Sequence, residues 1–258
     1  MTDKLIVEKR GNIALLTMNN PPANTWTEES LKALKALVEE LNADRDIYSL
    51  VITGQGEKFF SAGADLNLFA DGDRSVARDM ARYFGEAFET LSQFRGVSIA
   101  AINGFAMGGG LEVALACDIR IAEEQSQMAL PEAKVGLLPC AGGTQNLTML
   151  VGEGWTKRMI LCGERIKAVK AQEIGLVEEV VPQGQVLEKA LELAANVAQQ
   201  SPTAVASCKQ LIQNNRTHHW DAGYILEREL FVDLFFTEDQ KEGVNAFLGK
   251  RAPEWKNR

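Results

Sequence analysis

The strongest constraint on the fold is an alternation of short apolar runs with amphipathic runs over the first half of the chain. Apolar residues recur at helical spacing at 27–42 and 76–94. Strand-like runs fall at 5–9, 13–19, 48–54, 97–103 and 118–123. The first two runs flank Arg10-Gly11-Asn12, a hairpin signal, and the others alternate with helical patterns. This order predicts an α/β protein in which helices cross over between the strands of a layered core.

The ends of two segments carry further signals. Thr25 and Glu28 are spaced as a capping box ahead of the first helix. After Pro182 the pattern becomes almost entirely helical, at 186–199, 202–213, 221–236 and 239–248. The polar stretch at 199–202 marks a boundary, which predicts a core at 1–200 and a helical region at 201–258.

The apolar run "YILERELFVDLFF", at 224–236, holds more apolar side chains than a lone surface helix needs. We therefore expect this helix to pack between subunits or domains.

Composition narrows the classes of partner. The 258 residues carry a net charge of −8, which argues against nucleic acid or an anionic membrane as the main partner, because both reward a basic surface. Neither a signal-peptide core nor an apolar run of about 18 residues occurs, so a cytoplasmic protein is expected.

No metal site is expected either. The two histidines, His218 and His219, are adjacent and cannot share a helix face. No C-x-x-C spacing occurs among the four cysteines, which are Cys117, Cys140, Cys162 and Cys208.

Three glycines, Gly108 to Gly110, open the helical run at 111–116. Glycine costs about 1 kcal/mol relative to alanine inside a helix, so bare backbone must be needed there. One interpretation is a cradle for an oxyanion, since the first N–H groups of a helix have no internal partners. The other is close packing or a tight turn, and the residues alone leave both open.

Two further segments have the character of a site. Small residues at 61–64 follow a strand, where open α/β sheets place ligands. Glu132 follows a proline and precedes a glycine-rich turn, a position that is more often a solvated loop. The Rossmann, P-loop and nucleophile-elbow patterns all fail, because Phe59 occupies a required glycine position and Gly249-Lys250 lacks the P-loop context.

Five ordered segments carry a family resemblance: "FFSAGADL", "AAINGFAMGGGLEVALACDIRIA", "ALPEAKVGLLPCAGGTQ", "GLVEEVVP" and "EGVNAFLGKRAPEW". The chain resembles the enoyl-CoA hydratase/isomerase (crotonase) superfamily from Leu5 to Trp255. The resemblance implies a spiral of repeated ββα units and a helical C-terminal region that assembles trimers, often paired as hexamers. It also implies an acyl-coenzyme A thioester as substrate, with no cofactor other than the coenzyme A of that substrate.

The resemblance also implies roles for individual residues. The peptide N–H groups of Ala64 and Gly109 match the oxyanion hole that binds the thioester carbonyl oxygen. Glu112 matches the base that activates water for attack on C3, and Glu132 matches the acid that protonates C2.

For coenzyme A, the resemblance implies binding by the backbone at Ala62, Ala64, Asp65 and Leu66. Phosphate contacts fall to Lys250 and Arg251, for which a solvated charge cluster is the alternative. The chain departs from the family at Cys140, where glycine or alanine is usual, and at Asn146, where arginine is common.

The predicted function is therefore enoyl-CoA hydratase: syn-addition of water to a trans-2-enoyl-CoA, giving a 3-hydroxyacyl-CoA, as in the β-oxidation of fatty acids. Alternatives are an enoyl-CoA isomerase and a branched-chain hydratase of the methylglutaconyl-CoA type. A non-enzymatic acyl-CoA- or RNA-binding relative is the alternative from another class, and the acidic charge and the glutamate pair argue against it.

Overall fold

The computed structural model describes residues 2–216 and 220–258, so His218 and His219 lie outside the described residues. The chain opens with the predicted hairpin, in which β1 (Leu5–Arg10) and β2 (Ile13–Met18) pair antiparallel. From β2 onward the large sheet is parallel, in the order β1-β2-β3-β5-β7-β10. It includes β3 (Ser49–Gly54), β5 (Val97–Ile102), β7 (Ile119–Glu123) and β10 (Glu179–Val181).

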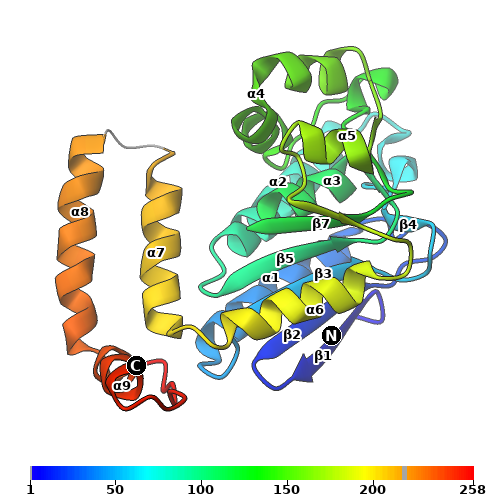
Figure 1. The fold of residues 1–258 in the computed structure, drawn as a ribbon. Coiled ribbons are helices and arrows are strands. Elements are labelled where there is room, and N and C mark those ends of the chain that lie inside the picture. The colour runs from blue at the N-terminus through cyan, green and yellow to red at the C-terminus, as the bar shows by residue number, and fades with distance from the viewer. Residues whose placement is uncertain (1, 217–219) are drawn as a thin grey trace.

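A second, smaller sheet runs alongside the first. It contains β4 (Phe59–Ser61), β6 (Phe105–Met107) and β8 (Gln127–Ala129), which are parallel, and the antiparallel edge strand β9 (Ile166–Lys167). Each of the strands β3, β5 and β7 in the large sheet is followed by β4, β6 or β8 in the small one. The next elements are α2 (Arg74–Ser92), α3 (Gly109–Ala116) and, after a short 3₁₀ helix, α4 (Gly143–Leu161). This repeated ββα coil confirms the predicted spiral α/β fold (Figure 1).

Helices cover both faces of the large sheet. One core contains α1 (Glu28–Ala43), which buries Leu31, Leu34, Val38 and Leu41 and packs against α2. The opposite face carries a separate apolar cluster, in which α6 (Val186–Val197) contributes Val186, Ala190 and Ala194. The helix α5 (Ala168–Glu173), which follows β9, buries Ala168 and Ala171 in the same core as α1.

The predicted capping box at Thr25 and Glu28 is wrong by two residues. Thr27 is the N-cap of α1: its side chain accepts the N–H of Ser30, and the Ser30 hydroxyl accepts the N–H of Thr27. Serine replaces the usual glutamate in this reciprocal pair, which hid the true box from a pattern search.

The C-terminal region begins with α7 (Pro202–Asn214), which is held to the sheet by one lysine. Lys209 Nζ donates to the carbonyl oxygens of Phe94 (2.6 Å) and Gly96 (3.0 Å) and pairs with Asp118 Oδ2 at 2.7 Å. Gly96 and Asp118 immediately precede β5 and β7. The lysine therefore joins α7 to the amino ends of two central strands.

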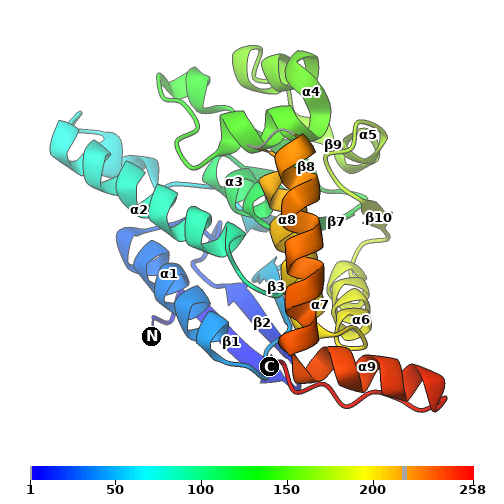
Figure 2. The ribbon, with the colours of Figure 1, turned by 90° about the vertical axis from the view of Figure 1, so that its left-hand side faces the viewer.

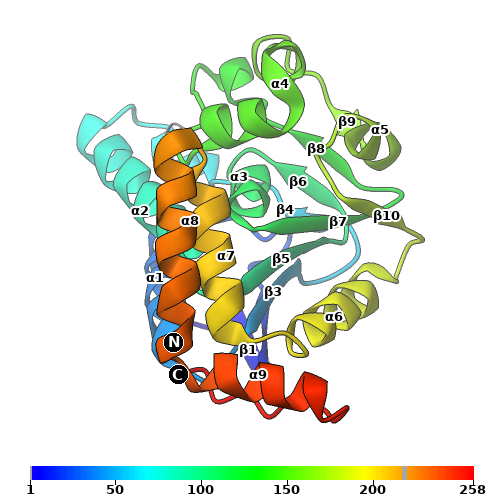
Figure 3. The same cartoon turned by 60° about the vertical axis from the view of Figure 1, so that its left-hand side comes forward.

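Beyond α7 the chain extends away from the sheets. α8 (Trp220–Asp233) runs beside α7 on its outer side, and α9 (Glu238–Leu248) turns under both, as Figures 1 and 2 show. Figure 3 shows α8 outermost again from another direction. The division at residue 200 remains a prediction.

The chain end folds back onto this region. Asp239 is fully buried, and its Oδ1 accepts the N–H groups of Lys256 (2.7 Å) and Asn257 (3.0 Å). Asn257 in turn bonds the carbonyl of Arg45 and the guanidinium of Arg95. Within the described ranges, no helix is long and apolar enough to cross a membrane.

Candidate active site

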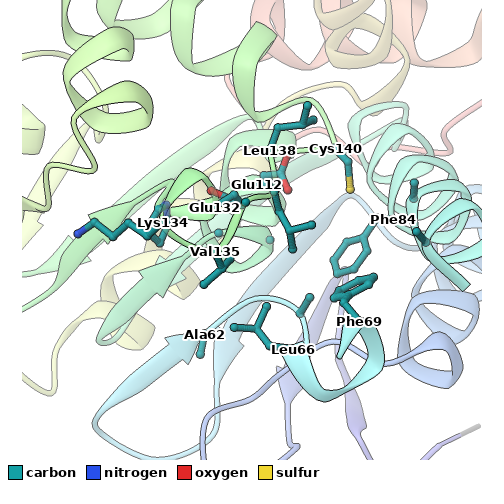
Figure 4. Close-up of a pocket in the computed structure, with 18 of the residues that line it drawn as sticks. Ala62, Leu66, Phe69, Phe84, Glu112, Glu132, Lys134, Val135, Leu138 and Cys140 are labelled. Atoms are coloured by element: carbon teal, nitrogen blue, oxygen red, sulfur yellow. The ribbon is translucent and has the colours of Figure 1, made fainter. Parts of the chain in front are cut away.

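A pocket of about 790 Å³ lies where the small parallel sheet ends. The loop after β4, the start of α3 and the 3₁₀ helix η2 (Glu132–Val135), which follows β8, all reach it. Figure 4 shows apolar side chains around two carboxylates. The residues that line the pocket are Ala62, Ala64, Leu66, Phe69, Ala77, Ala81, Phe84, Gly108, Gly109, Glu112, Pro131, Glu132, Lys134, Val135, Gly136, Leu137, Leu138, Cys140 and Arg165.

The three glycines at the start of α3 meet the close-packing interpretation raised by the sequence, and the oxyanion interpretation stays a prediction. Gly108 has φ +54°, a conformation that favours glycine. A Cβ on Gly110 would lie 2.1 Å from the carbonyl oxygen of Ser61, so that position needs close packing. Gly109 begins the helix, and the first N–H groups of a helix have no partner inside it. Close packing therefore holds a helix N-terminus open to the pocket.

The loop after β4 meets α3 at this point. Gly63 has φ +88°, and a Cβ built on it would lie 2.9 Å from the nitrogen of Gly109. The approach brings Ala64 and Gly109 into the same pocket. Within residues 2–216 and 220–258, the Ala64 N–H has no hydrogen-bond acceptor. Two peptide donors are thus available for an oxygen atom that gains negative charge.

Glu112 is buried in the second turn of α3, with 2% of its surface exposed. Its Oε1 accepts the N–H of Ala141 at 2.8 Å and the N–H of Gly143 at 2.9 Å. Burial raises the pKa of Glu112, and hydrogen bonds from the N–H groups of the 140–143 turn act in the opposite direction. The turn therefore fixes the orientation of this carboxylate and stabilises its charged form.

Glu132 opens η2 and is half-buried. Its Oε1 lies 3.0 Å from the place that a Cβ on Gly108 would take, so the carboxylate sits over the start of α3. Its Oε2 is buried without a hydrogen-bond partner in the described part of the chain. Burial, together with the negative charge of Glu112, raises the pKa of Glu132 to about 7. Two carboxylates with different surroundings therefore face one pocket, as an acid–base pair requires.

The segments expected to bind coenzyme A are only partly brought together. Ala62, Ala64 and Leu66 line the pocket, and Asp65 caps the 3₁₀ helix η1 (Leu66–Phe69) by accepting the N–H of Asn67 at 3.0 Å. Lys250 and Arg251 follow α9 and do not line the pocket of this chain. Arg251 pairs with Glu242, at 2.5 and 2.8 Å.

The sequence reasoning missed several lining residues. Ala81 and Phe84 lie on the same face of α2 as Ala77, beyond the segment 66–80 that we expected to line the acyl pocket. Lys134 and Arg165 carried no signal. No group of three or more His, Cys, Asp or Glu side chains that could hold a metal ion occurs among the residues that the structure describes.

The chain is similar to known proteins over its whole length. The family model described as "Enoyl-CoA hydratase/isomerase" matches residues 8–258. The chain is 42% identical to the 2,3-dehydroadipyl-CoA hydratase of Escherichia coli and 38% identical to the short-chain-enoyl-CoA hydratase of Clostridium acetobutylicum; each match covers 99% of both chains.

Solved structures are also similar. Pseudomonas aeruginosa DspI is 66% identical, with a TM-score of 0.97 over 99% of this chain and 97% of that one. An enoyl-CoA hydratase from Bacillus anthracis is 36% identical, with a TM-score of 0.95 over 99% of this chain and 100% of that one.

Proposed function

The chain belongs to the enoyl-CoA hydratase/isomerase family and is an enzyme of the hydratase type, and we propose that it adds water in syn fashion to trans-2-enoyl-CoA, giving 3-hydroxyacyl-CoA. The carrying observation is the pair of carboxylates in one pocket: Glu112 is held by two N–H groups, and Glu132 has a pKa of about 7. A base and an acid are both needed for hydration, and these surroundings suit one group to each role.

The reaction follows from these positions. The Ala64 and Gly109 N–H groups hold the thioester oxygen, which gains negative charge as the enolate forms. Glu112 takes a proton from water while the water oxygen bonds to C3. Glu132 gives its proton to C2, so the product gains one complete water molecule. The pair ends with its single proton on Glu112 instead of Glu132, and exchange with solvent restores the starting state.

The acyl tail is proposed to be uncharged. Phe69, Ala77, Ala81 and Phe84 form an apolar wall, and the nearby Lys134 lies on the far side of Glu132 from Phe84 in Figure 4. One of the named relatives is a 2,3-dehydroadipyl-CoA hydratase, and an adipyl chain ends in a second carboxylate. The α2 residues that line the pocket are all uncharged, and no arginine of α2 is among the lining.

Isomerisation is the second candidate. Moving a proton between C2 and C4 through an enolate requires one carboxylate and the same two N–H donors. A second buried carboxylate, fixed by Ala141 and Gly143, is not needed for that reaction and supports hydration.

We propose that the reaction needs no cofactor other than the coenzyme A of the substrate. We also propose that the protein assembles as a trimer or a hexamer. The loop from Ala62 to Leu66 offers backbone at the pocket edge for the coenzyme A. An apolar surface on α8 and the following turn supports assembly: Phe231, Phe235 and Phe236 are 62%, 58% and 88% exposed in the single chain.

The direct test is hydration of crotonyl-CoA by the purified protein in water enriched in oxygen-18. We expect loss of the conjugated enoyl-thioester absorbance and one labelled oxygen at C3 of the product. Formation of a 3-enoyl-CoA without label would instead establish the isomerase. A second readout is independent of turnover: binding should lower the carbonyl stretching frequency of butyryl-CoA, because two N–H donors polarise that bond.

A further inference from the structure

Cys140 projects into the pocket from the loop between η2 and α4. It precedes Ala141, whose N–H holds Glu112. In Figure 4 its sulfur points toward Phe84, on the same side of the pocket as Leu138. The exposed surface of Cys140 therefore belongs to the pocket.

Phe84, which faces Cys140 across the pocket, is tightly packed on its other sides. Phe84 is 3% exposed, and its ring packs edge-on against Phe88 with 5.6 Å between centroids. Phe88 packs in the same way against Trp26 at 5.5 Å. A Cβ on Gly109 would lie 2.8 Å from the Phe84 ring, so the ring also abuts α3. Phe84 is thus held by neighbours behind it, and a change of side chain at position 140 alters the space on its pocket side.

The Cys140 thiol acts through its volume. Burial, with the negative charges of Glu112 and Glu132, raises its pKa to about 11, so the side chain is neutral and a poor nucleophile near pH 7. The N–H of the neighbouring Ala141 is bonded to Glu112 at 2.8 Å, so position 140 lies next to that carboxylate. The substrate atoms between the two carboxylates are C2 and C3.

We propose that Cys140 is a specificity-determining residue that occupies the space beside C3, so that the pocket accepts unbranched 2-enoyl thioesters and rejects those with a substituent on C3. This inference rests on the proposed hydratase function, since it places C2 and C3 between Glu112 and Glu132. On this proposal, a branch on C3 would meet the Cys140 thiol on one side and the packed Phe84 ring on the other, and removal of the thiol would free that space.

The test compares kcat/KM for 3-methylcrotonyl-CoA with kcat/KM for crotonyl-CoA. In Cys140→Ala and Cys140→Gly, the ratio of the branched to the unbranched value should rise about 10-fold or more, since one methyl group in a pocket changes discrimination by about 10–200-fold. Cys140→Val should lower the ratio. Cys162→Ala and Cys208→Ala are the matched controls, because both cysteines are exposed and neither lines the pocket; their ratios should match the wild type.

A binding measurement separates this inference from the proposed reaction. Calorimetry with butyryl-CoA and 3-methylbutyryl-CoA should show the same preference for the unbranched ligand in the wild type and its loss in Cys140→Ala. If the wild type binds with this preference but does not hydrate crotonyl-CoA, the proposed reaction fails and the role of Cys140 stands. A folded Cys140→Ala protein with both ratios within twofold of the wild type would overturn the inference.

Discussion

The peptide N–H of Gly143 lies 2.9 Å from Oε1 of Glu112, and the same glycine leaves no room for a side chain against that carboxylate. A Cβ on Gly143 would lie 2.8 Å from this oxygen and 2.9 Å from Cβ of Pro139. The first residue of α4 therefore both holds Glu112 and depends on being glycine.

A methyl group at this position should displace Glu112 without removing any titratable group. We expect Gly143→Ala to lower kcat for crotonyl-CoA by about 10²-fold, because small misplacement of a catalytic group has effects of this size. KM should change much less. Steady-state kinetics on a variant with an unaltered circular dichroism spectrum checks this.

The matched control lies on the same helix. A Cβ on Gly154 would meet no atom within 4 Å, so Gly154→Ala should keep wild-type kcat. Equal losses in the two variants would show that α4 as a whole, and not the bond to Glu112, is responsible.

Removal of the carboxylates one at a time tests their roles directly. Glu112→Gln and Glu132→Gln should each lower crotonyl-CoA hydration by about 10²–10⁴-fold, the usual range for general acid–base groups. The double variant should lose far less than the product of the two, since both act on one water molecule. A well-folded Glu132→Gln protein with near-normal hydration would place Glu132 outside the reaction.

The rate should depend on pH through the single proton that the pair shares. Glu132 must be protonated to donate a proton to C2, and its pKa is about 7. The value of kcat/KM should therefore fall as the pH rises above about 7. At low pH, protonation of Glu112 removes the base and the rate falls again. The reverse reaction should have the same profile, because the overall equilibrium takes up no proton. A value of kcat/KM that keeps rising to pH 9 in the wild type would contradict this assignment.

Assembly should depend on the aromatic surface of α8 and the following 3₁₀ turn (Leu234–Phe236). Phe231 and Phe235 stack edge-on at 5.5 Å and remain exposed in the single chain. Sedimentation of the wild type should show a trimer or a hexamer, whereas Phe235→Glu combined with Phe236→Glu should give monomers. Val169→Glu, at an exposed position on α5, serves as the comparison. A wild-type protein that sediments as a monomer at micromolar concentration would contradict this proposal.

The chain end should contribute to stability through one residue. Asn257→Ala removes the bonds to the Arg45 carbonyl and to Arg95, and alanine fits poorly at φ +58°. We expect a loss of about 1–3 kcal/mol in the free energy of unfolding, or a few degrees in Tm. Arg258→Ala should change little, because its guanidinium forms only an exposed pair with Glu238. Thermal denaturation of both variants decides the point.

The larger elements were readable from the sequence because their apolar spacing is regular. The hairpin, α1, α2, the strands β3, β5 and β7 and the C-terminal helices all follow that spacing, whereas the three-residue strand β10 was not predicted. The strands β4 and β6 have only three residues each, too few for a period to show. The small sheet, and with it the floor of the site, therefore could not be derived from local pattern.

The site was less readable from the residues than from the family resemblance. The strands β7 and β8 lie between Glu112 and Glu132 in the sequence, and the spacing of the two glutamates does not show that they face one pocket. The three glycines indicated that bare backbone is needed. The reason at Gly110 is the approach of the Ser61 carbonyl, which comes from a distant segment of the chain. Cys140 and Phe84 likewise come together in the pocket only through tertiary packing, which the periodicity of a single sequence does not reveal.

In the proposed mechanism, the parallel order β4-β6-β8 gives each coil of the spiral one part of the chemistry. The coil ending at β4 supplies Ala64, the next supplies Gly109 and Glu112, and the third supplies Glu132. A change of residue at the end of the third coil would replace the proton donor and leave the thioester grip of the first two intact. Such a scaffold lets evolution exchange one reaction for another on the same class of thioester by altering a single coil, without rebuilding the site.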